Sequence, residues 1–184
     1  MKSYEDKIVF LVVSRFKISF MKLYYLLFLL AIGCAPKQKI ETQKTEITTI
    51  LDNWHKAAAA ANFEAYFEIL SDESIFIGTD ASENWNKLQF QNFAKPYFDK
   101  GKAWRFNAIE RTIYFSKDKK VVWFDELLTT QMKICRGSGV LAMENGQWKI
   151  KHYVLSMTIP NDNVDEVVKI KAPIEDALME SLKK

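Results

Sequence analysis

The sequence predicts an α+β domain in which helices come first and an antiparallel sheet follows. Residues 45–61 carry apolar side chains at helical spacing along one face of the segment. Between residues 103 and 158 the chain changes to segments rich in β-branched and aromatic residues, which favour strands. Asn145-Gly146 separates the last two of these segments and is a strong signal for a hairpin turn.

The helical half begins with the segment 45–61, which places Trp54 and Ala58 on its apolar face. Asn62 is expected to cap a second, short helix that turns Tyr66 inward. A short strand is predicted at residues 74–77. A third helix is predicted at 84–98, with Trp85, Leu88 and Phe93 inward and a stop at Gly101.

The second half is expected to hold strands at 103–115, 120–133, 138–144 and 147–158. Turns are predicted at residues 117–119, 136–137 and 144–146, so that the last three strands form an antiparallel meander. A final helix is predicted at 164–182, interrupted by Pro173.

The N-terminal segment looks like an export signal. Residues 23–33 are an apolar run that directly follows Met21-Lys22, and this run is too short to span a bilayer. Translation is expected to start at Met21; the alternative is a long basic region over residues 1–20. Ala31-Ile32-Gly33 before Cys34 resembles the lipobox of bacterial lipoproteins.

That resemblance implies cleavage before Cys34 and acylation of this cysteine, which would anchor the chain to a membrane. Residues 1–33 are then a signal segment, and residues 34–43 a polar, unpatterned tether. The expected location is the bacterial cell envelope, with the domain on the periplasmic or outer side.

Composition narrows the range of functions. Residues 1–34 contain all of the excess positive charge, and the rest of the chain has 21 basic and 21 acidic residues. A neutral domain argues against a nucleic-acid partner. His55 and His152 are the only histidines and no acidic cluster has metal-ligand spacing, so neither a metal nor another cofactor is expected. Cys135, alone after Cys34, is expected to be a small buried residue.

The order of elements resembles the SnoaL-like branch of the nuclear transport factor 2-like superfamily. The residues that carry the resemblance are Trp54, Ala58, Phe63, Tyr66, the segment 76–80, Trp85, the segments 122–126 and 136–141, and Trp148 through Ser156. The resemblance implies a cone-shaped, curved antiparallel sheet wrapped around the N-terminal helices, with a pocket inside. It covers a domain at residues 44–160, followed by a helical tail at 161–184.

Members of this superfamily include isomerases, cyclases, dehydratases and many domains without known activity. Related sequences often carry a histidine late in the last strand, where this chain has Val154. Related domains also often dimerise through the outer face of the sheet, so the resemblance offers a homodimer as one arrangement.

The last strand supplies one candidate site. In a regular strand, Trp148, Ile150, His152 and Ser156 share one face, and the lysines at 149 and 151 mark the other face as solvated. His152 and Ser156 are therefore expected to point inward. His152 would then bind a polar group of a ligand or act as a general base; a hydrogen-bonded core histidine is the alternative.

Asp125 and Glu126 are the acidic candidates, and adjacent strand residues point to opposite faces. If Trp123 is inward, Asp125 is inward too; if Phe124 is inward, Glu126 is. A carboxylate in an apolar cavity could serve as acid or base, whereas at the surface it would be an ordinary charge or a partner for Arg136.

Arg136, if buried, could neutralise a carboxylate of a ligand. The residues expected to contact a ligand are Trp54, Tyr66, Trp123, Arg136, His152 and Ser156. Large rings at these positions are more often core than specific stacking groups.

Three functions remain open from the sequence. The favoured one is a membrane-tethered pocket domain that binds a small apolar or amphipathic molecule. The second is an enzyme of the isomerase or dehydratase type that uses His152 with an acidic residue. The third is an interaction or structural protein of the cell envelope.

Overall fold

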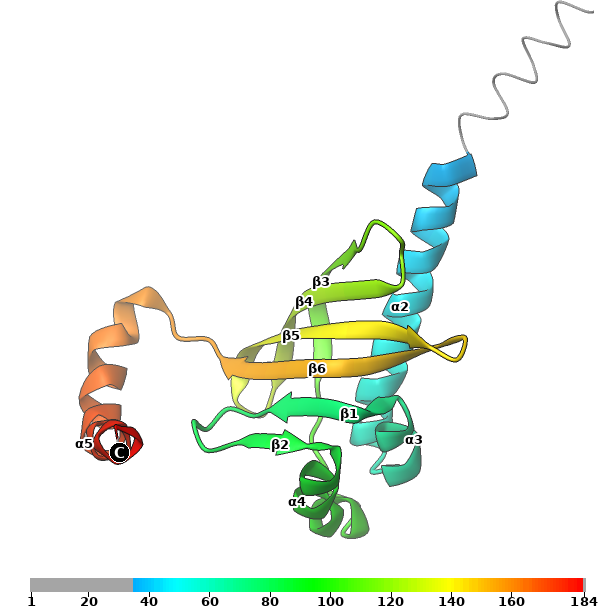
Figure 1. The fold of residues 1–184 in the computed structure, drawn as a ribbon. Helices are drawn as coiled ribbons and strands as arrows, with labels where there is room; N and C mark the ends of the chain where they lie inside the picture. Colours follow the sequence, from blue (N-terminus) through cyan, green and yellow to red (C-terminus); the bar gives the residue numbers. More distant parts are fainter. Residues whose placement is uncertain (1–34, 184) are drawn as a thin grey trace, which may run out of the picture. The chain divides into compact units, whose positions relative to one another are not determined.

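The structure is a computed structural model that describes residues 35–183. Its helices are α2 (Ala35–Ala59), α3 (Phe63–Glu68), α4 (Lys87–Asp99) and α5 (Val164–Leu182), with a 3-10 helix, η1 (Asn161–Asn163), before α5 (Figure 1). Its strands are β1 (Leu70–Ile77), β2 (Asn84–Asn86), β3 (Asn107–Phe115), β4 (Val121–Thr130), β5 (Lys133–Glu144) and β6 (Gln147–Met157). The predicted α+β class is confirmed.

The strands form one curved, unclosed sheet in the order β2-β1-β6-β5-β4-β3 (Figure 1). Strands β3 to β6 are an antiparallel meander, which confirms that prediction. β1 joins the meander by pairing parallel with β6, and β2 pairs antiparallel with β1. The β5–β6 hairpin turns on Asn145 and Gly146, whose φ angles of 50° and 82° lie in the left-handed region that this tight turn requires.

Side-chain caps set where the short helices begin. Asn62 accepts a hydrogen bond from the backbone N–H of Ala65 at 3.1 Å and so caps α3, as predicted. Asn86 and Gln89 form a reciprocal capping box at the start of α4. α4 therefore begins after Asn86 and not at residue 84, because the preceding residues pair with β1 as strand β2.

The later start of α4 also changes its buried face. Phe90, Ala94 and Phe98, spaced four residues apart, are buried against the domain. Leu88 is 65% exposed and Phe93 is 38% exposed, so the prediction that both point inward is wrong.

Helix α2 is longer than the sequence indicates. It begins at Ala35 and so includes residues 35–43, which were expected to be an unpatterned tether. Pro36 falls in the first turn, where proline is tolerated, and neither glycine nor another proline follows before Ala59. The boundary between the two compact units of the chain, Met1–Thr48 and Thr49–Lys184, falls within this helix.

The predicted signal segment, residues 1–33, and the predicted lipidation site, Cys34, lie outside the described residues. Within residues 35–183, no helix combines the length and apolar character needed to cross a membrane.

Strand β5 runs without a break through Arg136 and Gly137, where the sequence predicts a turn. The chain turns instead at Gln131 and Met132, between β4 and β5. Gly137 is required within the strand, because a Cβ at this position would lie 2.2 Å from the Tyr153 hydroxyl oxygen. The glycine here provides space for a neighbouring ring rather than a bend.

Strand β6 contains a bulge opposite β5. Val140 pairs with His152, but the next residue of β5, Leu141, pairs with Ile150, so Lys151 is an extra residue in β6. An extra residue reverses the side-chain alternation of a strand beyond that point.

The reversal moves the predicted site residues of β6. The buried residues of the strand are Trp148 and Ile150 before the bulge, and Tyr153 and Leu155 after it. His152 is half-buried on the outer face and Ser156 is exposed. The expectation that His152 and Ser156 point inward is wrong, because it assumed regular alternation through the whole strand.

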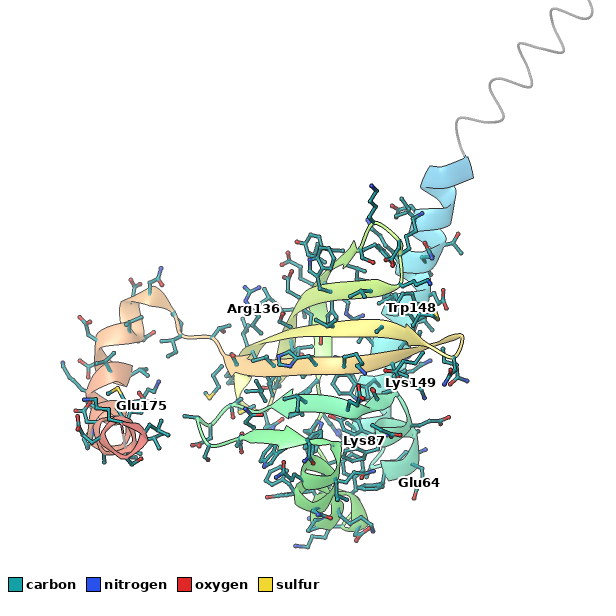
Figure 2. All side chains as sticks on the ribbon, viewed as in Figure 1. Glu64, Lys87, Arg136, Trp148, Lys149 and Glu175 are labelled. Carbon is teal, nitrogen blue, oxygen red and sulfur yellow. The ribbon has the colours of Figure 1, made fainter. Side chains whose placement is uncertain are left out.

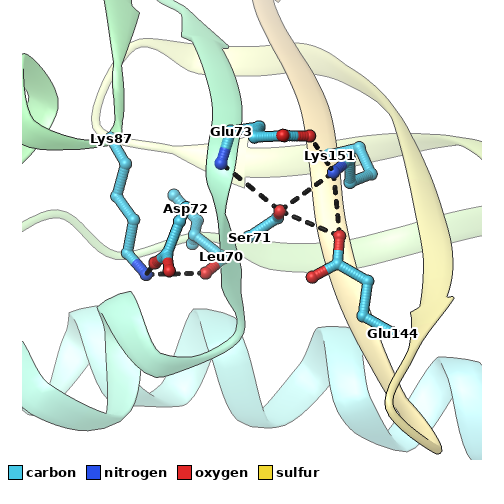
Figure 3. A network of polar contacts seen from close by, with 7 residues as sticks. All are labelled: Leu70, Ser71, Asp72, Glu73, Lys87, Glu144 and Lys151. Atoms are coloured by element: carbon cyan, nitrogen blue, oxygen red, sulfur yellow. Dashed lines mark hydrogen bonds and ion pairs between the residues drawn. The ribbon is translucent and has the colours of Figure 1, made fainter.

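Polar contacts hold β1 against β5 and β6 beside this bulge (Figure 3). Lys151 Nζ donates hydrogen bonds to Ser71 Oγ at 3.0 Å and to Glu144 Oε1 at 2.8 Å. Lys151 also bonds Glu73 Oε2 at 3.0 Å, and Ser71 Oγ donates to Glu144 at 2.9 Å. The hydrogen bonds to Glu144 and Glu73 raise the pKa of Lys151, although the pairing is only partly buried.

Candidate functional site

A cavity of about 180 Å³ lies among aromatic side chains from several elements. Phe76 comes from β1, Trp85 from β2, and Phe90 and Phe93 from α4. We call this space the aromatic cavity; its wall is completed by Gly78, Thr79, Glu83, Trp104, Phe106, Gln131, Met132 and Leu155. Rings, Met132 and Leu155 make most of the wall apolar.

The rings of the aromatic cavity are held by one another. Phe90 is central: its ring centroid lies 3.9 Å from that of Phe76 and 5.7 Å from that of Trp85. Trp104 stacks on the same ring, with centroids 5.8 Å apart and planes inclined by 20°. Because Phe90 itself is fully buried, these contacts fix the wall before any ligand arrives.

A larger, open hollow of about 680 Å³ adjoins the aromatic cavity. Phe93, Trp104 and Gln131 line both spaces. The other residues that line the open hollow are Tyr97, Lys102, Ala103, Arg105, Asn107, Thr129 and Thr130. The two spaces therefore differ in character: the aromatic cavity is mainly apolar, whereas the open hollow combines aromatic side chains with the cations Lys102 and Arg105.

A second polar feature lies inside the domain, centred on Glu126 of β4. Glu126 Oε1 accepts hydrogen bonds from the Tyr153 hydroxyl at 3.0 Å and from His55 Nε2, which lies 2.8 Å away. Glu126 Oε2 accepts from Arg111 Nε at 2.8 Å and pairs with Arg111 Nη2 at 2.7 Å. Arg111 Nη1 also donates to Asp52 Oδ1 at 2.8 Å. We call these residues the Glu126 network.

The electrostatics of the Glu126 network favour a charged carboxylate. Burial by itself would raise the pKa of Glu126, but the hydrogen bond from His55 and the charges of His55 and Arg111 outweigh burial. The pKa of Glu126 therefore lies below its ordinary value. Burial, followed by the nearby charge of Glu126, raises the pKa of the Tyr153 hydroxyl well above its ordinary value, so Tyr153 remains a neutral donor.

The Glu126 network is separate from the two hollows. None of its members lines the aromatic cavity or the open hollow. Two of its members contact rings of the cavity wall: Tyr153 lies 5.5 Å from Phe76 and His55 lies 5.9 Å from Phe106, measured between ring centroids. Both oxygens of Glu126 are already occupied by donors, so the network serves to join α2, β3, β4 and β6 rather than to abstract a proton from a ligand.

Comparison with known families gives a direct match. Residues 47–160 match the family described as the SnoaL-like domain. The chain belongs to this family. The resemblance predicted from the sequence is therefore confirmed at this level, whereas none of the curated proteins that were compared matches the chain.

Solved structures support the same fold for this SnoaL-like chain. A nuclear transport factor 2-like protein of unknown function from Pseudomonas putida aligns over 67% of this chain and 92% of its own, with 11% identity and a TM-score of 0.57. A protein provisionally named a scytalone dehydratase, from Novosphingobium aromaticivorans, aligns over 67% and 89%, with 8% identity and a TM-score of 0.58. The association domain of CaMKII from C. elegans aligns over 64% and 97%, with 16% identity and a TM-score of 0.53.

The structure settles which acidic candidate of this SnoaL-like domain faces inward. Phe124 and Glu126 are each 1% exposed, whereas Trp123 is 46% exposed. Asp125 shares the outer face with Trp123 and lies 3.5 Å from Arg136 Nη1. Glu126 is thus the inward carboxylate, and Asp125 forms the surface pair that the sequence left as one alternative.

The other predicted ligand residues are not brought together. Arg136 extends from β5 as an exposed side chain (Figure 2). Trp54 and Tyr66 are buried and stack on each other, with ring centroids 5.2 Å apart. Neither these residues nor Trp123, His152 or Ser156 line the aromatic cavity or the open hollow, and their contact with a ligand stays a prediction.

Sequence reasoning missed Arg111 and His55 as functional candidates. The signal for Arg111 was present: it shares the inner face of β3 with Ile113, just as Glu126 shares the inner face of β4 with Phe124. Opposite charges on the apolar faces of two neighbouring strands indicate a buried pair. His55 stands beside Trp54 on α2, and no local pattern links it to a residue of β4.

Cys135 is fully buried, as predicted, with Thr130 Oγ1 3.5 Å from its sulfur. Across residues 35–183, the histidine, cysteine and acidic side chains form no group of three or more that could hold a metal ion.

Proposed function

We propose that this SnoaL-like domain binds a small apolar or amphipathic molecule, with the apolar part of the molecule in the aromatic cavity. The observation that carries the proposal is the cavity of about 180 Å³ lined by stacked rings. An engineered apolar cavity of roughly 150 Å³ is known to hold benzene, so this space suits one ring or a short branched chain. The adjoining open hollow can receive a polar part.

The residues of the aromatic cavity and the positions of His152 and Glu126 favour binding over catalysis. Glu83 is the one residue of the aromatic cavity wall with an ordinary acid or base side chain. The enzyme alternative needs His152 to act with an inward carboxylate, and His152 lies on the face of the sheet opposite Glu126. The buried Glu126 is saturated by His55, Arg111 and Tyr153.

The test uses neutral one-ring probes, toluene and indole, measured by isothermal titration calorimetry and by thermal denaturation. A probe that binds the native state raises Tm as its concentration rises. Met132→Trp should fill the cavity and abolish binding, because Met132 lines it from the turn between β4 and β5. Met132→Leu, which nearly conserves volume, is the matched control and should bind as the wild type does.

If neither toluene nor indole binds the wild-type protein, the pocket proposal is wrong. Equal binding by Met132→Trp and the wild type would also contradict it, since the probe would then occupy another place. Circular dichroism of both variants separates loss of the site from loss of the fold.

We further propose that the protein is a lipoprotein held to a membrane of the bacterial cell envelope through acylated Cys34. The support is the sequence alone: the apolar run 23–33 after Met21-Lys22, and small residues before Cys34. Mass spectrometry of the mature N-terminus should find a lipid-modified Cys34, and Cys34→Ser should move the protein from the membrane fraction to the soluble fraction. An unmodified Cys34 would rule the anchor out.

A homodimer through the outer face of the sheet is our proposal for self-association. Tyr114 and Trp123 stack there, with ring centroids 5.8 Å apart, and each is more than 40% exposed. Val140 and His152 continue this row across β5 and β6. Trp123→Lys should give a monomer in light scattering, and Trp123→Phe should retain the dimer; a wild-type monomer at high concentration would exclude the arrangement.

A further inference from the structure

Two basic side chains stand beside the aromatic cavity. Lys102 and Arg105 line the open hollow, and both are exposed. Within residues 35–183, neither has an ion-pair partner, and none of the residues that line the open hollow is acidic. A cationic hollow without its own counter-charge favours an anion at this position.

The chain segment that carries these cations also builds the cavity wall. Residues 102–106 connect α4 to β3, and within them Trp104 and Phe106 line the aromatic cavity. Trp104 is held against Phe90 and Phe98, with centroids 5.8 and 5.4 Å apart. The backbone that carries the cations is therefore held close to the rings, because one short segment supplies both.

The carboxylate of Glu83 adds a negative charge to the aromatic cavity, whereas Lys102 and Arg105 add positive charge to the open hollow. Glu83 lines the aromatic cavity but not the open hollow, and its Oε2 accepts a hydrogen bond from the backbone N–H of Asp80 at 3.1 Å. An anionic group would be repelled by Glu83 and attracted by Lys102 and Arg105. Gln131, which lines both spaces, offers an amide at the border between them.

We propose that the ligand class is a small amphipathic carboxylate, with its ring or branched chain in the aromatic cavity and its carboxylate between Lys102 and Arg105. The inference rests on the proposed function and adds the charge and orientation of the ligand. Arginine binds a carboxylate through paired N–H groups and lysine as a point charge, so the two side chains can share one anionic group.

The experiment compares three probes of the same size on the whole protein by isothermal titration calorimetry at low salt. The probes are phenylpropanoate, phenylpropanol and phenylpropylamine. The acid should bind about tenfold more tightly than the alcohol, as expected for charge pairing at a solvated site, and the amine should bind most weakly. The preference for the acid should shrink as salt is added.

The variant Lys102→Gln/Arg105→Gln should bind the acid and the alcohol equally while keeping the wild-type affinity for the alcohol. Lys100→Gln/Lys117→Gln removes the same charge from positions that line neither space, and it should keep the preference for the acid. Both variants change exposed side chains, so the fold should be retained.

The outcomes separate this inference from the pocket proposal. Equal binding of acid and alcohol by the wild type, or a preference for the amine, would overturn the inference and leave the pocket in place. Binding of none of the three probes would overturn both. An unchanged preference for the acid in Lys102→Gln/Arg105→Gln would show that the anion binds at another position. This result would overturn the assignment of these two residues.

Discussion

The substitution Glu126→Gln tests the claim that the Glu126 network holds the domain together. The glutamine has nearly the same shape as glutamate but lacks the charge that Arg111 and His55 bind. It keeps a single acceptor oxygen, and its amide group places a donor where the glutamate accepts one. The side chain of Arg111 is only 6% exposed, so it would remain buried after losing the carboxylate of Glu126.

The expected loss follows from this geometry. Removing one partner of a buried ion pair typically costs about 3–5 kcal/mol, because the other charge stays buried without compensation. Domains of this size unfold with roughly 5–15 kcal/mol, so the variant would lose a large share of its stability. The corresponding decrease in Tm is roughly 6–20 °C.

Urea denaturation, followed by tryptophan fluorescence, measures the free energy of unfolding of the wild type and of each variant. Asp125→Asn is the matched control: it changes the adjacent carboxylate, whose partner Arg136 lies 3.5 Å away at the surface. The control should change stability by about 0.5 kcal/mol or less. A loss of under about 1 kcal/mol for Glu126→Gln, similar to the control, would refute the idea that the network is a structural clamp.

Three further predictions concern Glu126, Gly137 and Lys151. Because the pKa of Glu126 is below its ordinary value of 4.5, its contribution to stability is complete above pH 4.5 and is lost as the pH falls through the lower folded-state pKa. The stability difference between the wild type and Glu126→Gln should therefore narrow in acid, and a constant difference would contradict this. Gly137→Ala should cost about 1–3 kcal/mol in urea denaturation, since its methyl group would meet the Tyr153 hydroxyl; no loss would show that the β5–β6 contact relaxes freely. Lys151→Ala should cost about 1 kcal/mol or less, because its ion pairs with Glu73 and Glu144 are partly exposed. A loss as large as that of Glu126→Gln would mean that this surface cluster is the stronger clamp.

The alternation of side chains along a strand predicted the orientation of some candidate residues and not of others. The alternation rule correctly tied the orientation of Glu126 to that of Phe124, but it left open which pair faces inward. The same rule gave the wrong side for His152, because the bulge at Lys151 adds one residue to β6. A bulge depends on pairing with another strand, so the sequence of β6 alone carries no clear sign of it.

The sequence by itself determined the α+β class, the order of the helices and strands apart from β2, the SnoaL-like resemblance, the Asn62 cap and the Asn145-Gly146 turn. These features depend on residues close together in the chain, where spacing and turn preference act directly. Only the tertiary structure decided the aromatic cavity, the Glu126 network and the outward position of His152. Each of these depends on contacts between segments far apart in sequence: His55 and Glu126 meet across α2 and β4, and the cavity wall needs β1, β2, α4 and β6 together.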